Sequence, residues 1–452
     1  MAGGDAGALG DRVRIRVESW KGEVEHEGML MPAAAEGHVT IKLVNGYNIS
    51  FSESSVQEMI RIGGPLKFAE EVLSAAQDES LPKVTIIHTG GTIASKVDYK
   101  TGAVVARFEP EELLAENPEL RAQACISTLK LGNMWSDDMR TQHWNAMLEA
   151  TSSAFESGAV GVVICQGTDT MHYSSAAVAL GWCGSGGIPP GRIVFTGSQR
   201  SSDRGSTDAY ENLLAAVHWA AHGPAVGGDA GDGTVLVMHA GPDDGLCAVW
   251  PGIAVRKLHT SRRDAFQGIN AGPLANISID RGKAQIEPIA EMRGGGRERI
   301  SEPEGFDCDI KISHLIANAH LDASLVDHCR EAGHAGLVLH GTGLGHLPIE
   351  DPMGDSPENL LLAEALRNYV DTGGIAVVVA QCIHGGIDLN VYSKGRNQQE
   401  LGLLGHGANT SPETLAVKLH WLLSQPKATE DGWVADRLKV NLCGEDPEVI
   451  KE

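Results

Sequence analysis

Hydrophobic residues in the middle of the chain occur in short unbroken runs, and helical patterns separate these runs. Apolar runs of this kind, rich in β-branched residues, are typical of strands that are buried on both faces. They predict strands at residues 84–87, 159–164, 192–195 and 234–238. The intervening patterns predict helices at residues 174–182 and 208–218. Buried strands that alternate with helices indicate βαβ units and a mostly parallel sheet.

A different pattern precedes this region. Val13, Ile15 and Val17 alternate with arginines, which is typical of a half-buried strand, and short strands continue to about residue 51. Asn45-Gly46 between two of them predicts a two-residue hairpin turn. We therefore expect a small β-barrel of SH3-like size. A role in folding or assembly is a simpler interpretation of this unit than a catalytic role.

A second, smaller α/β unit is predicted towards the C-terminus. Its strands are expected at residues 310–316, 336–339 and 375–380, and one of its helices at residues 360–371. The predicted fold class is thus α/β, with two domains built on parallel sheets and an SH3-like β-barrel in front of them. The expected organisation is a disordered tail 1–10, the barrel 11–64, a connector 65–82 that includes a helix at 68–77, the larger domain 83–290, a Gly-rich linker 291–307, the smaller domain 308–425 and a peripheral tail 426–452.

Length, charge and cysteine content limit the classes of protein to which the chain could belong. A chain of 452 residues is too long for one core. Its formal charge of −23 disfavours extended direct contact with nucleic-acid phosphates. The eight cysteines include no Cys-x-x-Cys pair, so we expect free thiols in a reducing compartment and no metal site. The sequence shows no charged and then apolar leader and no membrane-spanning run, which predicts a cytoplasmic protein.

Candidate chemistry gathers where the predicted strands end. Two turns carry threonines, Thr89-Gly90-Gly91-Thr92 and Gly167-Thr168-Asp169-Thr170, and Ser198 follows a third strand as a candidate substrate contact. Ligands bind beyond the carboxyl ends of the strands in parallel sheets. A threonine hydroxyl can attack an amide carbon when a base removes its proton. Lys257 is a candidate base, although spacing alone does not favour it over Arg256 or Lys283. Each threonine could instead be a helix N-cap.

The motifs at residues 89–95, 167–171 and 196–200, together with the segment around Lys257, resemble the bacterial-type L-asparaginase/glutaminase family over about residues 83–425. The resemblance implies a large N-terminal and a smaller C-terminal α/β domain, with two threonines facing the substrate amide. It also implies that a C-terminal loop reaches the active site of a neighbouring subunit, which favours a homodimer.

The resemblance also implies roles for individual residues. Thr89 matches the nucleophile, and Tyr99 matches the tyrosine of a mobile loop that closes on the substrate. Thr168, Asp169 and Lys257 match the second threonine, its acidic neighbour and the lysine base.

Four further residues complete the expected site. Ser136 and Asp137 match the pair that binds the α-amino and α-carboxyl groups, although the family often has glutamine where Asp137 stands. Backbone around Thr89 and Thr168, including Gly90 and Gly167, would stabilise the oxyanion.

The N-terminal module and the phrase from Val97 to Ala103 resemble the D subunits of archaeal glutamyl-tRNA(Gln) amidotransferases. This resemblance implies that the chain hydrolyses glutamine or asparagine and passes ammonia to a partner E subunit. The partner would bind tRNA(Gln) and activate the attached glutamate with ATP and Mg²⁺, and this chain would hold no cofactor. A homodimer within a heterotetramer is expected. The alternatives are a free-standing L-asparaginase with an extra barrel and a catalytically silent assembly subunit.

Overall fold

The structure is a computed structural model. It describes residues 8–19, 22–33, 37–43, 48–64, 77–91, 95–97, 104–106, 118–200, 206–226, 233–290 and 297–447. Tyr99, the Asn45-Gly46 turn and most of the predicted tail and helical connector lie outside these residues, as do residues 291–296 of the predicted linker.

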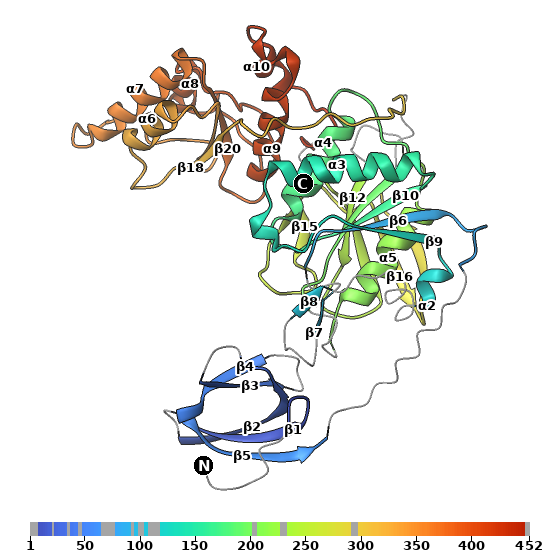
Figure 1. The fold of residues 1–452 in the computed structure, drawn as a ribbon. Helices are drawn as coiled ribbons and strands as arrows, with labels where there is room; N and C mark the ends of the chain where they lie inside the picture. Colours follow the sequence, from blue (N-terminus) through green and yellow to red (C-terminus); the bar gives the residue numbers. More distant parts are fainter. Residues whose placement is uncertain are drawn as a thin grey trace.

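The N-terminal unit is a five-stranded antiparallel sheet that curls around its own small core (Figure 1). Its strands are β1 (Arg12–Ser19), β2 (Gly22–Met31), β3 (His38–Leu43), β4 (Asn48–Ser52) and β5 (Val56–Gly63), in the order β4-β3-β2-β1-β5. The predicted alternation is confirmed, because Val13, Ile15 and Val17 are buried. On the opposite face Arg14 and Arg16 form exposed ion pairs with glutamates of β2.

Strands β3 and β4 pair antiparallel, with Lys42 opposite Asn48. The predicted two-residue turn at Asn45-Gly46 lies between them, outside the described residues, and stays a prediction.

The largest sheet has eight strands, in the order β17-β16-β13-β12-β11-β10-β6-β9. Its bounds are β6 (Lys83–His88), β9 (Cys125–Lys130), β10 (Gly161–Cys165), β11 (Arg192–Thr196), β12 (Thr234–His239), β13 (Leu246–Pro251), β16 (Ala275–Asp280) and β17 (Lys283–Pro288). Strands β6, β10, β11 and β12 are parallel, as predicted, and β9, which was not anticipated, adds a further parallel strand beside β6. Strands β13, β16 and β17 extend the sheet antiparallel and were not anticipated.

Helices cover both faces of this sheet. Helices α3 (Thr141–Glu156) and α4 (Met171–Cys183) pack on one face, and α2 (Pro118–Arg121) and α5 (Ala209–His222) pack on the other. Helix α4 is apolar all round because it is enclosed on all sides, which agrees with the pattern of a fully buried helix.

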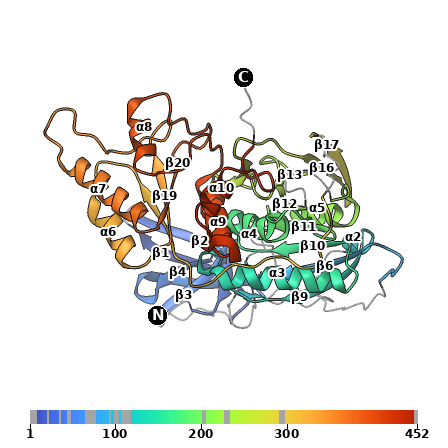
Figure 2. The same cartoon turned by 90° about the horizontal axis from the view of Figure 1, so that it is seen from above.

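The C-terminal unit has a three-stranded parallel sheet made of β18 (Ile312–Ile316), β19 (Gly336–Gly341) and β20 (Ile375–Ala380). One face packs on α6 (Ala323–Glu331) and α7 (Glu358–Asp371), with α8 (Ser393–Glu400) nearby. The other face packs on α9 (Pro412–Leu423), which also contacts α4. Helix α9 thus lies between the two sheets, with α10 (Trp433–Leu438) beside it (Figure 2). The exact ends predicted for each unit stay predictions.

Among the described helices, none combines the length and the apolar character needed to cross a membrane.

The segment after Gln425 is packed more deeply than the predicted peripheral tail. Leu442, Cys443 and Glu445 are buried. Glu445 forms a 2.7 Å ion pair with Lys418 of α9, and both side chains are almost fully enclosed. Burial alone would raise the pKa of the Glu445 carboxyl, but Lys418 and two backbone amides outweigh burial and lower it. The last described residues therefore hold α9 in place. No local sequence pattern predicted this contact.

Removing one partner of this pair is expected to destabilise the protein. Lys418→Met leaves a buried carboxylate without its cation and should cost about 3–5 kcal/mol. Lys439→Met removes an exposed ion pair with Asp436 and should change stability by less than about 0.5 kcal/mol. Thermal melting compares the two variants, and equal melting temperatures would contradict the predicted difference.

Acid should weaken the same contact. Because folding lowers the pKa of Glu445, its contribution to stability is present above the ordinary value of 4.5 and is lost as the pH falls through the lower folded value. Melting temperatures measured from pH 7 down to pH 3 should therefore fall less steeply in Glu445→Gln than in the unsubstituted chain. Parallel curves would show that Glu445 titrates normally.

Candidate active site

The two threonine turns lie side by side because β6 and β10 are neighbouring parallel strands. His88 lies opposite Cys165 at the ends of these strands, and Thr89 follows directly. The backbone N–H and the hydroxyl of Thr89 both donate to the Cys165 carbonyl, at 3.1 and 3.2 Å. Thr89 is buried, as is Thr168 three residues beyond Cys165. The structure therefore brings both threonines to one edge of the sheet.

Glycine is required in the first turn. Gly90 and Gly91 have φ values of +126° and +91°, which L side chains rarely adopt. A Cβ atom on Gly90 would lie 2.3 Å from the Met134 carbonyl oxygen, and one on Gly91 would lie 2.7 Å from the Gly167 nitrogen. The backbone after Thr89 is thus wedged between two other loops of the site.

Lys257 contacts both members of the second motif. Its Nζ donates to Thr168 Oγ1 at 2.8 Å and forms an ion pair with Asp169 Oδ1 at 2.8 Å. The lysine side chain is 9% exposed, whereas that of Asp169 is 68% exposed. Of the three basic residues that spacing left open, the structure thus brings only Lys257 to Thr168, among the described contacts. Arg256 pairs elsewhere, and Lys283 is exposed at the start of β17.

Ser136 joins the same turn from the other side. It begins the short 3-10 helix Ser136–Asp138, and its Oγ accepts the Asp169 N–H at 3.1 Å. Thr170 Oγ1 donates to the Ser136 carbonyl at 2.5 Å. Gly167 packs closely on Ser136, because an added Cβ would lie 3.1 Å from it. The structure therefore places Ser136 against the Thr168–Asp169 turn and leaves its neighbour Asp137 exposed.

Ser198 belongs to a different set of contacts. It lies at the end of β11, and its hydroxyl donates to Asp208 Oδ1 at 2.9 Å. Asp208 also accepts the backbone N–H groups of Gln199 and Arg200, so its carboxylate shapes this turn. The predicted substrate contact of Ser198 stays a prediction.

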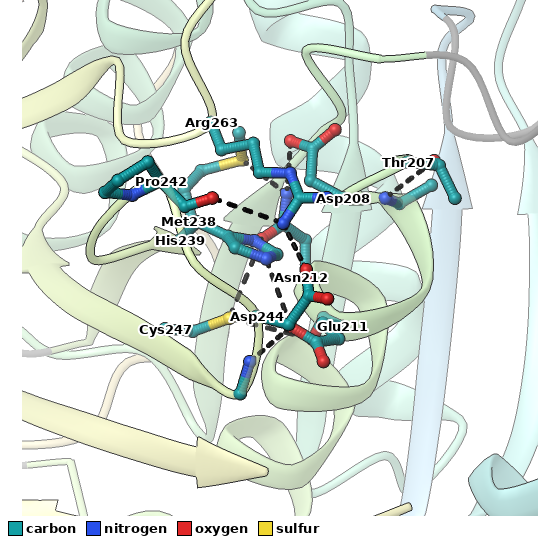
Figure 3. A network of polar contacts seen from close by, with 12 residues as sticks. Thr207, Asp208, Glu211, Asn212, Met238, His239, Pro242, Asp244, Cys247 and Arg263 are labelled. Atoms are coloured by element: carbon teal, nitrogen blue, oxygen red, sulfur yellow. Dashed lines mark hydrogen bonds and ion pairs between the residues drawn. The ribbon is translucent and has the colours of Figure 1, made fainter. Parts of the chain in front are cut away.

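A buried polar network continues from Asp208 (Figure 3). Asn212 bridges Asp208 and His239 Nδ1, at 3.0 and 2.7 Å. Glu211, His239 and Asp244 bring potential metal-ligand atoms within 4.8 Å of one another. His239 Nε2 lies 3.1 Å from Glu211 Oε2, yet the angle is not that of a hydrogen bond.

The charges of this cluster already have partners. Arg263 forms an ion pair with Asp244, and Glu211 accepts the Gly245 N–H. Burial lowers the pKa of His239, which favours the neutral ring. With a guanidinium already beside Asp244, we interpret the cluster as a polar network that fixes the loop after Lys257. The donor set itself does not require a metal ion.

A pocket of about 300 Å³ opens beside Lys257. Its lining residues are Asp169, His172, Arg256, Lys257, Leu258, His259, Thr260 and Glu413. Burial, with Arg256 and Lys257 nearby, lowers the pKa of His172 to about 3. His172 is therefore neutral at physiological pH.

Glu413 and His172 were not found by sequence reasoning. Glu413 lies in the first turn of α9 and forms a 2.8 Å ion pair with Arg256. The Ser411-Pro412 pair is a recognisable helix start, since serine caps and proline favours the first helical position. No local signal indicates that this helix end reaches the pocket beside Lys257.

Three family models match the chain in the order of its units. The GatD N-terminal domain matches residues 8–60, the asparaginase N-terminal domain residues 83–289, and the glutaminase/asparaginase C-terminal domain residues 311–432.

Similar proteins cover nearly the whole chain. The D subunit of glutamyl-tRNA(Gln) amidotransferase from Methanosarcina mazei is 36% identical over 96% of this chain and 97% of its own length. The D subunit from Pyrococcus furiosus is 39% identical over 92% of this chain and 90% of its own length. The L-asparaginase of Thermococcus kodakarensis shares the fold, with a TM-score of 0.65 and 24% identity over 81% of this chain and 99% of its own. The chain therefore belongs to the asparaginase family, in the group formed by the D subunits of glutamyl-tRNA(Gln) amidotransferases.

Gly90→Ala should damage the site. The substitution adds a methyl group 2.3 Å from a carbonyl oxygen at a positive φ, so the Thr89 turn must shift. We expect amide hydrolysis to fall by about 10²-fold, as misplacement of reacting groups does elsewhere. Gly158→Ala is the matched control, because Gly158 also has a positive φ but has open space around it. Equal loss of activity in both variants would mean that backbone strain alone, and not crowding of the site, is responsible.

Proposed function

We propose that this glutaminase subunit releases ammonia from glutamine at the site formed by Thr89, Thr168, Asp169 and Lys257. The observation that carries the proposal is the partly buried 2.8 Å contact between Lys257 Nζ and Thr168 Oγ1. A lysine held between a hydroxyl and a carboxylate can both donate and accept a proton, which is what amide hydrolysis requires.

The contacts suggest how the proton moves. We assign the covalent step to Thr89, whose hydroxyl must first turn away from the Cys165 carbonyl. Thr89 Oγ1 bonds to the amide carbon, the C–N bond breaks, and the proton lost by the hydroxyl ends on the leaving nitrogen. Lys257 donates to Thr168 Oγ1, so in the proposed relay Thr168 passes its own proton to that nitrogen, Lys257 replaces the Thr168 proton, and Lys257 takes up the proton that Thr89 loses. Water then hydrolyses the ester: its oxygen bonds to the acyl carbon, the bond from that carbon to Thr89 Oγ1 breaks, and one proton of the water returns to Thr89 Oγ1.

Three other groups are proposed to bind the substrate. Asp137 is exposed beside the catalytic turn and suits an α-amino group, and Ser136 is placed next to it. Tyr99, on the loop outside the described residues, would close the site. Backbone at Gly90 and Gly167 would stabilise the oxyanion, a contribution of about 10²–10³-fold per donor in comparable sites.

The ammonia is proposed to pass to an E subunit. That partner would bind tRNA(Gln) and amidate the attached glutamate with ATP and Mg²⁺, and this chain would need no cofactor. The formal charge of −23 agrees with leaving the tRNA to the partner. We also propose a homodimer within a heterotetramer. A cytoplasmic location fits the eight free cysteines.

Ammonia release from glutamine tests the site. Lys257→Met should lower kcat by about 10²–10⁴-fold, because the proton relay is lost. Lys283→Met removes an exposed lysine of β17 and should leave kcat unchanged. The assay is run with and without the partner and Glu-tRNA(Gln). Rapid asparagine turnover by the lone chain, indifferent to both, would instead favour a free-standing asparaginase. Absence of hydrolysis under every condition would favour an assembly subunit.

A covalent trap identifies the attacking threonine. A diazoketone analogue of glutamine should alkylate the nucleophile, and peptide mass spectrometry should locate the adduct on Thr89. Thr89→Val should abolish labelling. An adduct on Thr168, which already contacts a base, would reverse the assignment of the two threonines.

A further inference from the structure

Lys257, the proposed base, lies on a very short strand. Lys257 is the last residue of β14 (Val255–Lys257), which among the described residues pairs only with β15 (Phe266–Gly268), in a separate two-stranded sheet. A strand of three residues does not position a side chain by its own hydrogen bonds. The surrounding contacts must therefore hold Lys257 in place.

The first turn of α9 supplies those contacts. Glu413 Oε1 forms an ion pair with Arg256 Nη2 at 2.8 Å, and Arg256 directly precedes the lysine. Thr414 Oγ1 donates to the Ile253 carbonyl at 2.9 Å, just before β14 begins. Both residues belong to the helix that leads out of the C-terminal unit, capped by Ser411. The C-terminal unit thus holds the strand that carries the lysine.

The same helix packs on the other half of the site. Helix α9 contacts α4, which begins immediately after the Thr168–Asp169 turn, and both helices share one hydrophobic core with Val255 and Phe266. Helix α9 is therefore in contact with the elements that carry both the lysine and its partners.

The charged residues around the Arg256–Glu413 pair suggest that it does more than hold β14 against α9. Arg256, Lys257 and Asp169 line one pocket, together with Glu413. Asp169 is largely exposed, so its carboxylate is accessible to a second cation. Glu413 is 7% exposed, and only one of its oxygens has a hydrogen-bonding partner among the described residues, so Arg256 is the cation that balances it. An arginine released from Glu413 could form a bidentate pair with Asp169 in place of Lys257.

We propose that Glu413 is a positioning residue that keeps Arg256 away from Asp169, so that Lys257 alone occupies the carboxylate and stays on Thr168. The C-terminal unit would thereby set the catalytic lysine of the larger unit. This inference rests on the proposed role of Lys257.

A double-mutant cycle tests the proposal, with kcat and KM for glutamine hydrolysis as the readout. Glu413→Gln frees Arg256 and should lower kcat about 10-fold to 100-fold with little change in KM, because a misplaced relay slows chemistry and not binding. Arg256→Met/Glu413→Gln removes the competing cation together with its partner and should recover most of that loss. A double variant as slow as the single one, or slower, would overturn the proposal, as would an unchanged kcat in Glu413→Gln.

Two further variants separate positioning from folding. Glu445→Gln removes a buried carboxylate that pairs with Lys418 of α9 and does not line the pocket, and should lower the melting temperature without lowering kcat. Glu413→Asp keeps the charge and should retain most of kcat even if it melts earlier. If kcat instead follows the melting temperature through all four variants, Glu413 is only structural. If Lys257→Met keeps its activity, the proposed catalytic role of Lys257 is wrong, whatever the Glu413 variants show.

Discussion

The contact between Lys257 and Thr168 is the constraint around which the rest of the structure can be understood. Its two residues are separated by 89 positions in the chain. Each lies on a short element whose own hydrogen bonds do not fix the position of the side chain. Thr168 lies in a turn between β10 and α4, and Lys257 lies on a strand of three residues. The contact exists because the sheet, α4 and α9 pack around it.

Several polar groups around this contact are buried, and their partners explain why the burial is tolerated. A buried carboxylate is costly unless it is paired. Glu413 has Arg256, Glu445 has Lys418, and Asp208 has a hydroxyl and backbone N–H groups. The first pair joins α9 to β14 of the larger unit, and the second joins α9 to the segment that follows it. Helix α9 also contacts α4, so it connects the two α/β units. The third shapes the turn after β11.

The proposed catalytic groups and their support come from different parts of the molecule. Thr89 and Thr168 lie at the carboxyl ends of parallel strands, where ligands bind in such sheets. Lys257, the proposed base, lies on a strand that contacts the C-terminal unit through α9. The buried network of Figure 3 holds the loop that follows the lysine, because Arg263 of that loop pairs with Asp244 and donates to the Ser206 carbonyl.

Local sequence determined the elements and their chemistry. Runs such as 159–164 predicted buried parallel strands, alternation at Val13, Ile15 and Val17 predicted the first strand, and glycines at 90 and 91 marked a turn that only glycine can form. Tertiary structure decided what periodicity and spacing do not encode. Spacing alone could not choose Lys257 over Arg256, and that choice follows from which side chain the hairpin turns towards Thr168. The strands β13, β16 and β17, the burial of Glu445 and the pairing of Glu413 with Arg256 depend on contacts between distant segments. Such contacts form only when the whole chain packs, so no local pattern carries them.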